Sequence, residues 1–146
     1  MATETDFEVV SAVLSAEPIS VDQAIAAVES DTAGAVVSFS GVVRNHDGGR
    51  PVDRLGYSAH PSAGGVIADI AAEIAEKYDG VRIWVAHRIG PLEVGDPALV
   101  AAVASGHRGE AFAACSELVD TVKARAPIWK EQFFADGDVE WVGVDG

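Results

Sequence analysis

The order in which short apolar runs and amphipathic stretches follow one another most constrains the fold of this chain. Residues 81–90 and 98–105 are apolar runs of strand length, separated by a segment, 90–97, that holds two glycines and two prolines. Residues 62–78 instead place Ile67, Ile70, Ala71 and Ile74 on one face of a helix of about four turns. Strands and helices that alternate in this way predict an α+β fold with a largely antiparallel sheet.

The first half of the chain adds a strand, a helix and a hairpin to this pattern. We expect a strand over 7–14 and a short helix over 20–30 with Ser20 as its N-cap. A long strand over 34–43 then runs into the turn sequence RNHDGG. This turn predicts a hairpin at 44–51 and a returning strand over 52–59.

The C-terminal part predicts one more helix and one more strand. The helix begins near Arg108 and ends around residue 125, because Pro127 disfavours helical backbone at Ala126. The final strand is expected over 139–144. No linker or repeat interrupts the 146 residues, so we expect residues 1–146 to form a single domain.

Composition narrows the compartment and the partners. The chain has no apolar run of about 18 residues and an acidic N-terminus, which disfavours membrane insertion and export and favours the cytoplasm. Its net charge of −13 argues against nonspecific nucleic-acid binding. The four histidines are scattered and Cys115 is the only cysteine, so we expect no metal, and Cys115 is interpreted as a small buried hydrophobic residue.

Positive charge is scarce and grouped at the ends of predicted elements. His107 and Arg108 stand where a helix N-terminus could bind a phosphate, although Ser105 could equally cap that helix and leave Arg108 solvated. Lys123 and Lys130 lie on either side of the break at Pro127. They could bracket an anionic ligand, or Lys123 could simply complement the negative end of the helix dipole.

Two further pairs complete the candidate residues. Strand alternation places His87 and Arg88 on opposite faces of a sheet, so at most one of them enters a shared site. Ile128 and Trp129 are interpreted as core anchors. Motifs for nucleotide hydrolysis, zinc proteolysis and serine hydrolysis are missing, and these activities lose their main support.

Four motifs, in this order and spacing, resemble the large, catalytic subunit of molybdopterin synthase: SGVVRNHDGG at 40–49, HRIGPLEVGD at 87–96, HRGEAF at 107–112 and KARAPIWK at 123–130. The resemblance implies an α/β hammerhead fold with an additional antiparallel β-sheet. It also implies a sulfurtransferase without a cofactor of its own. The substrate would be cyclic pyranopterin monophosphate, which receives the two sulfurs of the molybdopterin dithiolene.

The resemblance further implies partners and site residues. Sulfur would arrive as a thiocarboxylate at the C-terminal Gly-Gly of a small ubiquitin-like subunit, and a homodimer of this chain would form the core of a heterotetramer. Lys123 and Lys130 would be catalytic and would also contact substrate. The other substrate contacts implied are Val42, Val43, Arg44, His107, Arg108, Glu131 and Gln132.

The chain departs from the family pattern at Ser58 and His60, which replace an acid and a tyrosine, and at Glu131, where a basic residue is common. Two alternatives remain. One is a non-catalytic scaffold that binds the tail of the sulfur carrier, against which the intact lysine pair argues. The other is an unrelated phosphate-ester-binding enzyme, for which the sequence offers neither a metal set nor a nucleophile.

Overall fold

A four-stranded sheet forms the main body of the computed structural model, which describes residues 8–143. Its strands lie in the order β1-β5-β7-β2, where β5 pairs parallel with β1 and the other neighbours are antiparallel. Their bounds are Glu8–Ser15 for β1, Ala35–Val42 for β2, Arg82–Arg88 for β5 and Pro97–Ser105 for β7. β1 and β2 are therefore the two outer strands of this sheet.

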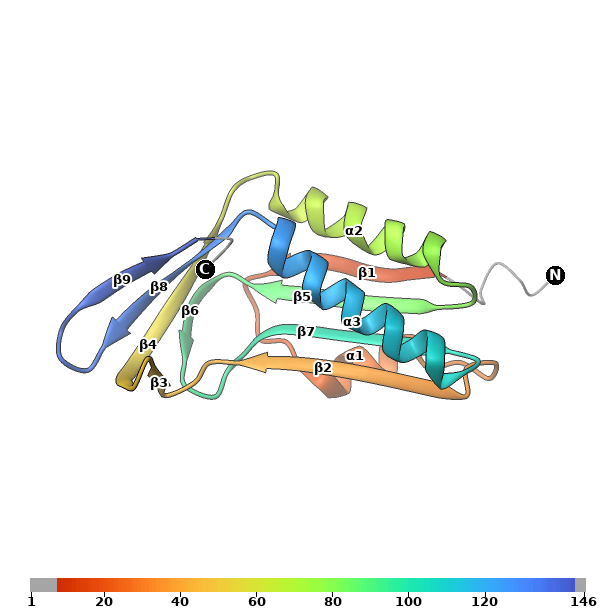
Figure 1. The fold of residues 1–146 in the computed structure, drawn as a ribbon, viewed down its shortest axis with the longest axis horizontal. Coiled ribbons are helices and arrows are strands. Elements are labelled where there is room, and N and C mark those ends of the chain that lie inside the picture. Colours follow the sequence, from red (N-terminus) through yellow and green to blue (C-terminus); the bar gives the residue numbers. More distant parts are fainter. Residues whose placement is uncertain (1–7, 144–146) are drawn as a thin grey trace.

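A second, antiparallel sheet lies at one end of the first (Figure 1). It runs in the order β3-β4-β8-β9, and β6 pairs with β4 as well. The bounds are His46–Asp47 for β3, Arg50–Ala59 for β4, Gly90–Glu93 for β6, Ile128–Phe134 for β8 and Val139–Val142 for β9. The α+β class and the additional antiparallel sheet are both confirmed.

Helices cover both faces of the first sheet, as Figure 1 shows. α2 (Ala63–Lys77) and α3 (Arg108–Arg125) pack on one face, and α1 (Val21–Val28) packs on the other. Strand alternation divides the core accordingly, because Ile83 of β5 packs in the cluster beneath α2 and α3, whereas its neighbour Trp84 packs in the cluster beneath α1.

Local sequence signals place the helix ends. The Ser20 hydroxyl accepts a hydrogen bond from the Gln23 backbone N–H at 3.1 Å, which confirms Ser20 as the N-cap of α1. α3 ends at Arg125, with extended backbone at Ala126 before the proline, as predicted. Ser105 is not the cap of α3: His107 occupies the N-cap position and makes no side-chain capping bond.

The predicted strand list was incomplete, because β3, β6 and β8 were missed. The turn at 44–51 exists, with Gly48 and Gly49 at positive φ, but its first arm is the two-residue β3. The long strand before it, β2, ends at Val42 and pairs with β7 in the first sheet. β2 and β4 therefore do not pair with each other. The prediction missed this because a short apolar run does not show which sheet it joins.

Two predicted ranges extend past the described residues. The predicted strand over 7–14 is observed as β1, and its first position lies outside the described residues. The predicted strand over 139–144 is observed as β9 from Val139 to Val142, and position 144 lies outside as well. Within residues 8–143, no helix has the length and apolar character needed to cross a membrane.

Candidate active site

A cavity of about 100 Å³ lies where the second sheet meets the C-terminal end of α3. Its polar lining residues are Tyr57, His87, Lys123 and Lys130, contributed by β4, β5, α3 and β8. The apolar walls include Val122 of α3 and Val142 of β9. The chain turns at Pro127, so α3 ends beside β8, and Lys123 of α3 and Lys130 of β8 can line the same cavity.

The two lysines of the C-terminal motif meet in this cavity but differ in exposure. Lys123 is exposed at the end of α3, whereas Lys130 is partly buried on β8. Burial lowers the pKa of Lys130, and the positive charges of Lys123 and Arg44 lower it further, while the Asp47 and Glu140 carboxylates oppose them. Of the two lysines, Lys130 is therefore the one whose surroundings lower its pKa.

Tyr57 and His87 form an aromatic pair on the cavity wall. Their ring centroids lie 4.8 Å apart in an edge-to-face arrangement. Across the second sheet, Tyr57 is the register partner of Lys130, which in turn pairs with Val142, so one row of three strands faces the cavity. Sequence analysis missed Tyr57, because β8 was not predicted and its register with β4 was therefore unknown.

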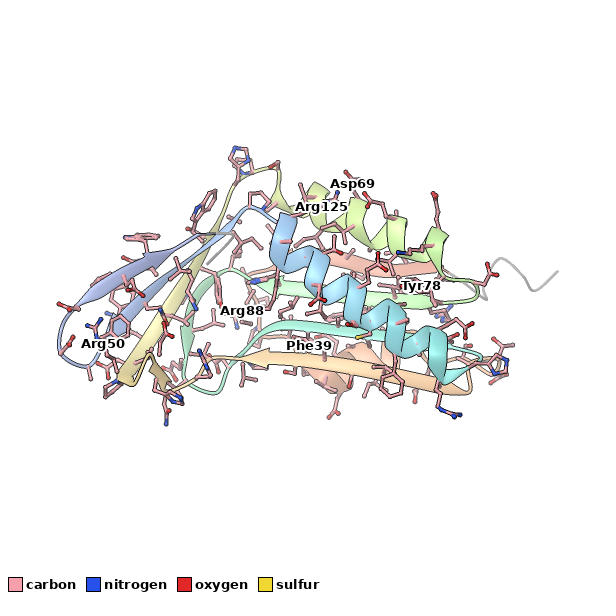
Figure 2. All side chains as sticks on the ribbon, in the orientation of Figure 1. Phe39, Arg50, Asp69, Tyr78, Arg88 and Arg125 are labelled. Carbon is pink, nitrogen blue, oxygen red and sulfur yellow. The ribbon has the colours of Figure 1, made fainter. Side chains whose placement is uncertain are left out.

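The prediction that His87 and Arg88 face opposite ways is confirmed. His87 lines the cavity, whereas Arg88 is only 8% exposed and turns toward β6, where its guanidinium lies 3.5 Å from the Pro91 carbonyl oxygen. Figure 2 places Arg88 near the junction of the two sheets. Of the pair, only His87 is positioned to act in the cavity.

Beside the cavity, a polar network connects Arg44 to the second sheet. The Arg44 guanidinium lies 3.7 Å from the Asp47 carboxylate. Gln132, only 3% exposed, donates from Nε2 to Asp47 at 2.8 Å and to Glu140 at 3.3 Å. The hydrogen bond from Gln132 lowers the pKa of Asp47, with help from the positive charges of Lys130 and Arg44. This network holds carboxylates near the cationic groups.

The remaining residues of these two motifs divide between inside and outside. Val43 is buried at 4% exposure, whereas Val42 is 50% exposed at the end of β2. Glu131 alternates with Lys130 and Gln132 along β8 and pairs with Trp141 of β9, so it lies on the opposite face of the second sheet. The interpretation of Trp129 as a core anchor is wrong for the same reason: Trp129 is 38% exposed, whereas Ile128 is buried at 8%.

One chain does not bring His107 and Arg108 to this cavity. Both are exposed at the start of α3. Arg108 and Lys123 stand fifteen positions apart on that helix, which corresponds to about 23 Å along its axis. Arg44 lies at the other end of β2 from Ala35, the residue that pairs with Ser105 just before His107.

Cys115 and His60 do not line the cavity. Cys115 is buried at 4% exposure on α3, and burial raises its thiol pKa to about 11, so the interpretation as a small buried hydrophobic residue is confirmed. The exposed His60 lies outside the cavity, with its ring nitrogen 2.8 Å from the Ser62 hydroxyl. The described part of the chain contains no cluster of three or more His, Cys, Asp or Glu residues suited to a metal ion.

Comparison with protein-family models and comparison with individual proteins point to the same family. The family model described as MoaE protein matches residues 14–125. The catalytic subunit 1 of molybdopterin synthase from Mycobacterium tuberculosis is 41% identical over 131 residues, which cover 89% of this chain and 88% of that protein.

Solved structures show the same similarity. The crystal structure of molybdopterin synthase from Staphylococcus aureus superposes with a TM-score of 0.81 at 37% identity, covering 94% of this chain and 97% of that one. A chain in the complex of subunits 1 and 2 of molybdopterin-converting factor from Helicobacter pylori matches with a TM-score of 0.63 at 19% identity, over 85% of this chain and 77% of that one, and so shares the fold.

Proposed function

This chain belongs to the MoaE family of molybdopterin synthase catalytic subunits, and from that premise we propose the reaction that it performs. It transfers sulfur from the C-terminal thiocarboxylate of a small ubiquitin-like carrier to cyclic pyranopterin monophosphate, and so forms the molybdopterin dithiolene. The observation that supports this most strongly is the cavity in which Lys123 and Lys130 meet. Both reactants are anions, and these two side chains supply positive charge to both.

The two lysines take different roles in this proposal. Lys123 is exposed at the cavity and can reach a tail that enters from outside, so it assists the attack of sulfur on the pterin and the breakdown of the acyl intermediate. Lys130 is partly buried and has a lowered pKa, so its ammonium group gives up a proton more readily than that of an ordinary lysine. Both lysines also contact the substrate.

Arg44 binds the substrate phosphate in this proposal, together with the backbone of Val42 and Val43. Its guanidinium is exposed and lies 3.7 Å from Asp47, a distance at which the arginine can exchange that carboxylate for a phosphate. Gln132 contributes through its buried side-chain amide, which donates to Asp47. Glu131 is the other substrate contact implied by the motif. Within one chain it faces away from the cavity, so it would reach the substrate only at the rim of the cavity.

A second copy of the chain supplies His107 and Arg108 in this proposal. β2 is an outer strand of the first sheet and carries the exposed side chain of Val36, and the exposed Phe112 of α3 lines a surface hollow together with Val37 and Phe39 of β2. Antiparallel pairing of β2 with the same strand of a second copy would set its Ala35 end against the partner's Val42 end. His107 and Arg108 of one chain would then approach Arg44 of the other.

We propose the following assembly and location. A homodimer forms the core of a heterotetramer, with one sulfur-carrier subunit for each catalytic chain. Residues 1–146 act as a single catalytic-subunit domain in the cytoplasm, without a cofactor, a metal, a membrane or a nucleic acid. The family of the chain and the net charge of −13 support this assignment.

Reconstitution tests the proposed function. The purified chain, mixed with a thiocarboxylated carrier subunit and cyclic pyranopterin monophosphate, is expected to produce molybdopterin, detected by mass spectrometry. A stable complex with the carrier but no product would favour the scaffold alternative. Failure to bind either the carrier or the pterin would contradict the proposed function.

A further inference from the structure

His87 is the polar cavity residue that the proposed function leaves without a role. It lies near the end of β5, half-buried, and lines the cavity from a different element than either lysine. Its ring packs edge-to-face against Tyr57, with 4.8 Å between centroids. The side chain is therefore held in one orientation, with one edge toward the cavity.

A backbone contact fixes which ring nitrogen carries the proton. Nδ1 of His87 lies 2.8 Å from the carbonyl oxygen of Arg88. A carbonyl can only accept a hydrogen bond, so Nδ1 is the donor, and in the neutral ring Nε2 is an unprotonated acceptor. The fold thus presets the tautomer that a general base requires.

The surroundings of His87 keep the ring neutral. Burial lowers the pKa of His87, the hydrogen bond to the Arg88 carbonyl opposes this, and the positive charge of Lys123 lowers the pKa further. The ionisable groups that share the cavity with it are Tyr57 from β4, Lys123 from α3 and Lys130 from β8. Its register partners on β1 and β7 are Leu14 and Leu99, which carry no charge.

No other described group of the cavity lining can accept a proton so readily near neutral pH. None of the described lining residues is a carboxylate. Burial raises the pKa of Tyr57, so its phenol stays protonated, and the ammonium form of a lysine has donors but no acceptor. His87 Nε2 is the neutral acceptor in a cavity otherwise supplied with donors.

The proposed reaction needs such an acceptor at one step. When the thiocarboxylate sulfur bonds to a pterin carbon, it displaces an oxygen substituent, and the carbon–oxygen bond breaks with its electron pair on oxygen. The sulfur also remains bonded to the carrier's carbonyl carbon, so the two molecules are joined by a thioester. Water must then attack this carbonyl carbon and break its bond to sulfur. The products are the carrier carboxylate and a pterin thiolate, and both protons of the water must be taken up.

We propose that His87 is a catalytic residue whose Nε2 takes the first proton from this attacking water. The oxygen–carbon bond forms as the proton moves to Nε2, and the carbon–sulfur bond breaks with its electron pair on sulfur. The resulting imidazolium and the new carboxylic acid then release their protons to solvent. Lys123 and Lys130 stabilise the negative charge that develops on the carbonyl oxygen and on sulfur. The inference rests on the proposed function.

His87→Asn is the most direct test, because the asparagine amide can still donate to the Arg88 carbonyl while no group replaces Nε2. In single-turnover reactions, mass spectrometry should show the covalent carrier–pterin adduct forming at the wild-type rate. Its hydrolysis should slow about 100-fold or more, so that the adduct accumulates. The rate of hydrolysis in the wild type should fall as the pH drops below neutrality, and the variant should lose this dependence.

A control and a second variant make the test decisive. His60→Asn, at an exposed histidine outside the cavity, should leave both steps unchanged. If His87→Asn does not fold, His87→Ala with added imidazole gives a second test, in which imidazole should restore hydrolysis. Hydrolysis at the wild-type rate, or an equal slowing of adduct formation and hydrolysis, would overturn the proposal. A wild-type protein that forms no adduct would instead contradict the proposed function.

Discussion

The lysines at 123 and 130 illustrate how one short motif gives two chemically different groups. Lys123 lies in the last turn of α3 and is exposed, whereas Lys130 is the third residue of β8 and is partly buried. Burial lowers the pKa of Lys130, and the nearby charge of Lys123 adds to this effect. The two lysines therefore differ both in their exposure to solvent and in how readily they give up a proton.

Lys123→Ala should lower turnover about 100-fold or more and leave the fold intact. The side chain is exposed at a helix end, so its truncation should change the free energy of unfolding by no more than about 1 kcal/mol. Turnover assays, thermal melts and a carrier pull-down check these expectations together. Lys123→Arg keeps the charge but does not deprotonate at accessible pH, so an active arginine variant would reduce the role of Lys123 to charge alone.

At the residue scale, the sequence predicted three cationic residues that lie in or beside the cavity, but it did not predict the residues around them. Motif spacing indicated Lys123, Lys130 and Arg44. It could not indicate Tyr57, because the residue reaches the cavity only through the pairing of β4 with β8. Trp129 was assigned to the core from its hydrophobicity, yet its exposure follows from strand alternation on β8.

β8 is the element that organises the site. Alternate residues of this strand face opposite sides, so Lys130 and Gln132 point toward the polar network while Glu131 points away. From the sequence, the helix was expected to end around residue 125, before Pro127, and no strand was predicted over the rest of the KARAPIWK motif. Charged and polar residues interrupt this segment, and pairing with β4 and β9 overrides its weak local signal.

Gln132→Ala and Glu131→Ala form a matched pair of variants that tests this alternation. Removing the buried Gln132 amide takes the donor from Asp47 and Glu140, and should lower the free energy of unfolding by about 1–2 kcal/mol. Glu131→Ala should change it by less than about 0.5 kcal/mol. Chemical denaturation at neutral pH checks both values, and equal losses would contradict the assignment of faces.

Acid titration of Gln132→Ala gives a second readout of the same network. The pKa of Asp47 is lower in the folded protein than its ordinary value of 3.8, chiefly because Gln132 donates to it. The stability that Asp47 contributes is therefore present above pH 3.8 and is lost as the pH falls through the lower, folded value. The variant should lose less stability than the wild type in this range. Identical acid profiles would show that Gln132 does not stabilise the carboxylate.

At the scale of the whole molecule, the two sheets have different structural roles. The first sheet and its helices form the larger apolar core, and the second sheet lies at one end of this body (Figure 1). Residues of β4, β8 and β9 in the second sheet line the cavity. Sequence periodicity predicted all three helices and most strands, but it could not assign strands to sheets. β2 and β4 follow each other along the chain, yet they belong to different sheets, because long-range pairing with β7 and β8 decides their places.

Mixing two inactive variants tests the proposed assembly. If Arg108 acts in the partner's cavity, Arg44→Ala and Arg108→Ala chains should each be impaired alone, the latter binding substrate about 1.5–3 kcal/mol more weakly. After subunit exchange, a mixed dimer contains one cavity with both arginines intact. Activity should return to about a quarter of the wild-type value, because about half of randomly paired dimers are mixed and each holds one complete site.

Two results would contradict this assembly. Activity of the mixture equal to the mean of the separate variants would place both arginines in one chain's site or remove one of them from catalysis. A stable species of the monomer's mass, 15.1 kDa, in sedimentation at micromolar concentration would exclude the dimer itself. Arg108 would then return to the interpretation as a solvated first-turn residue.

Sulfur tracing tests the central claim most directly. The carrier subunit is prepared with a heavy-sulfur thiocarboxylate and mixed with the wild-type chain and cyclic pyranopterin monophosphate, and the product is weighed by mass spectrometry. The account predicts molybdopterin with both dithiolene sulfurs labelled and a carrier that ends in an ordinary carboxylate. An unlabelled product, or a carrier that keeps its heavy sulfur while the pterin stays unchanged, would contradict it.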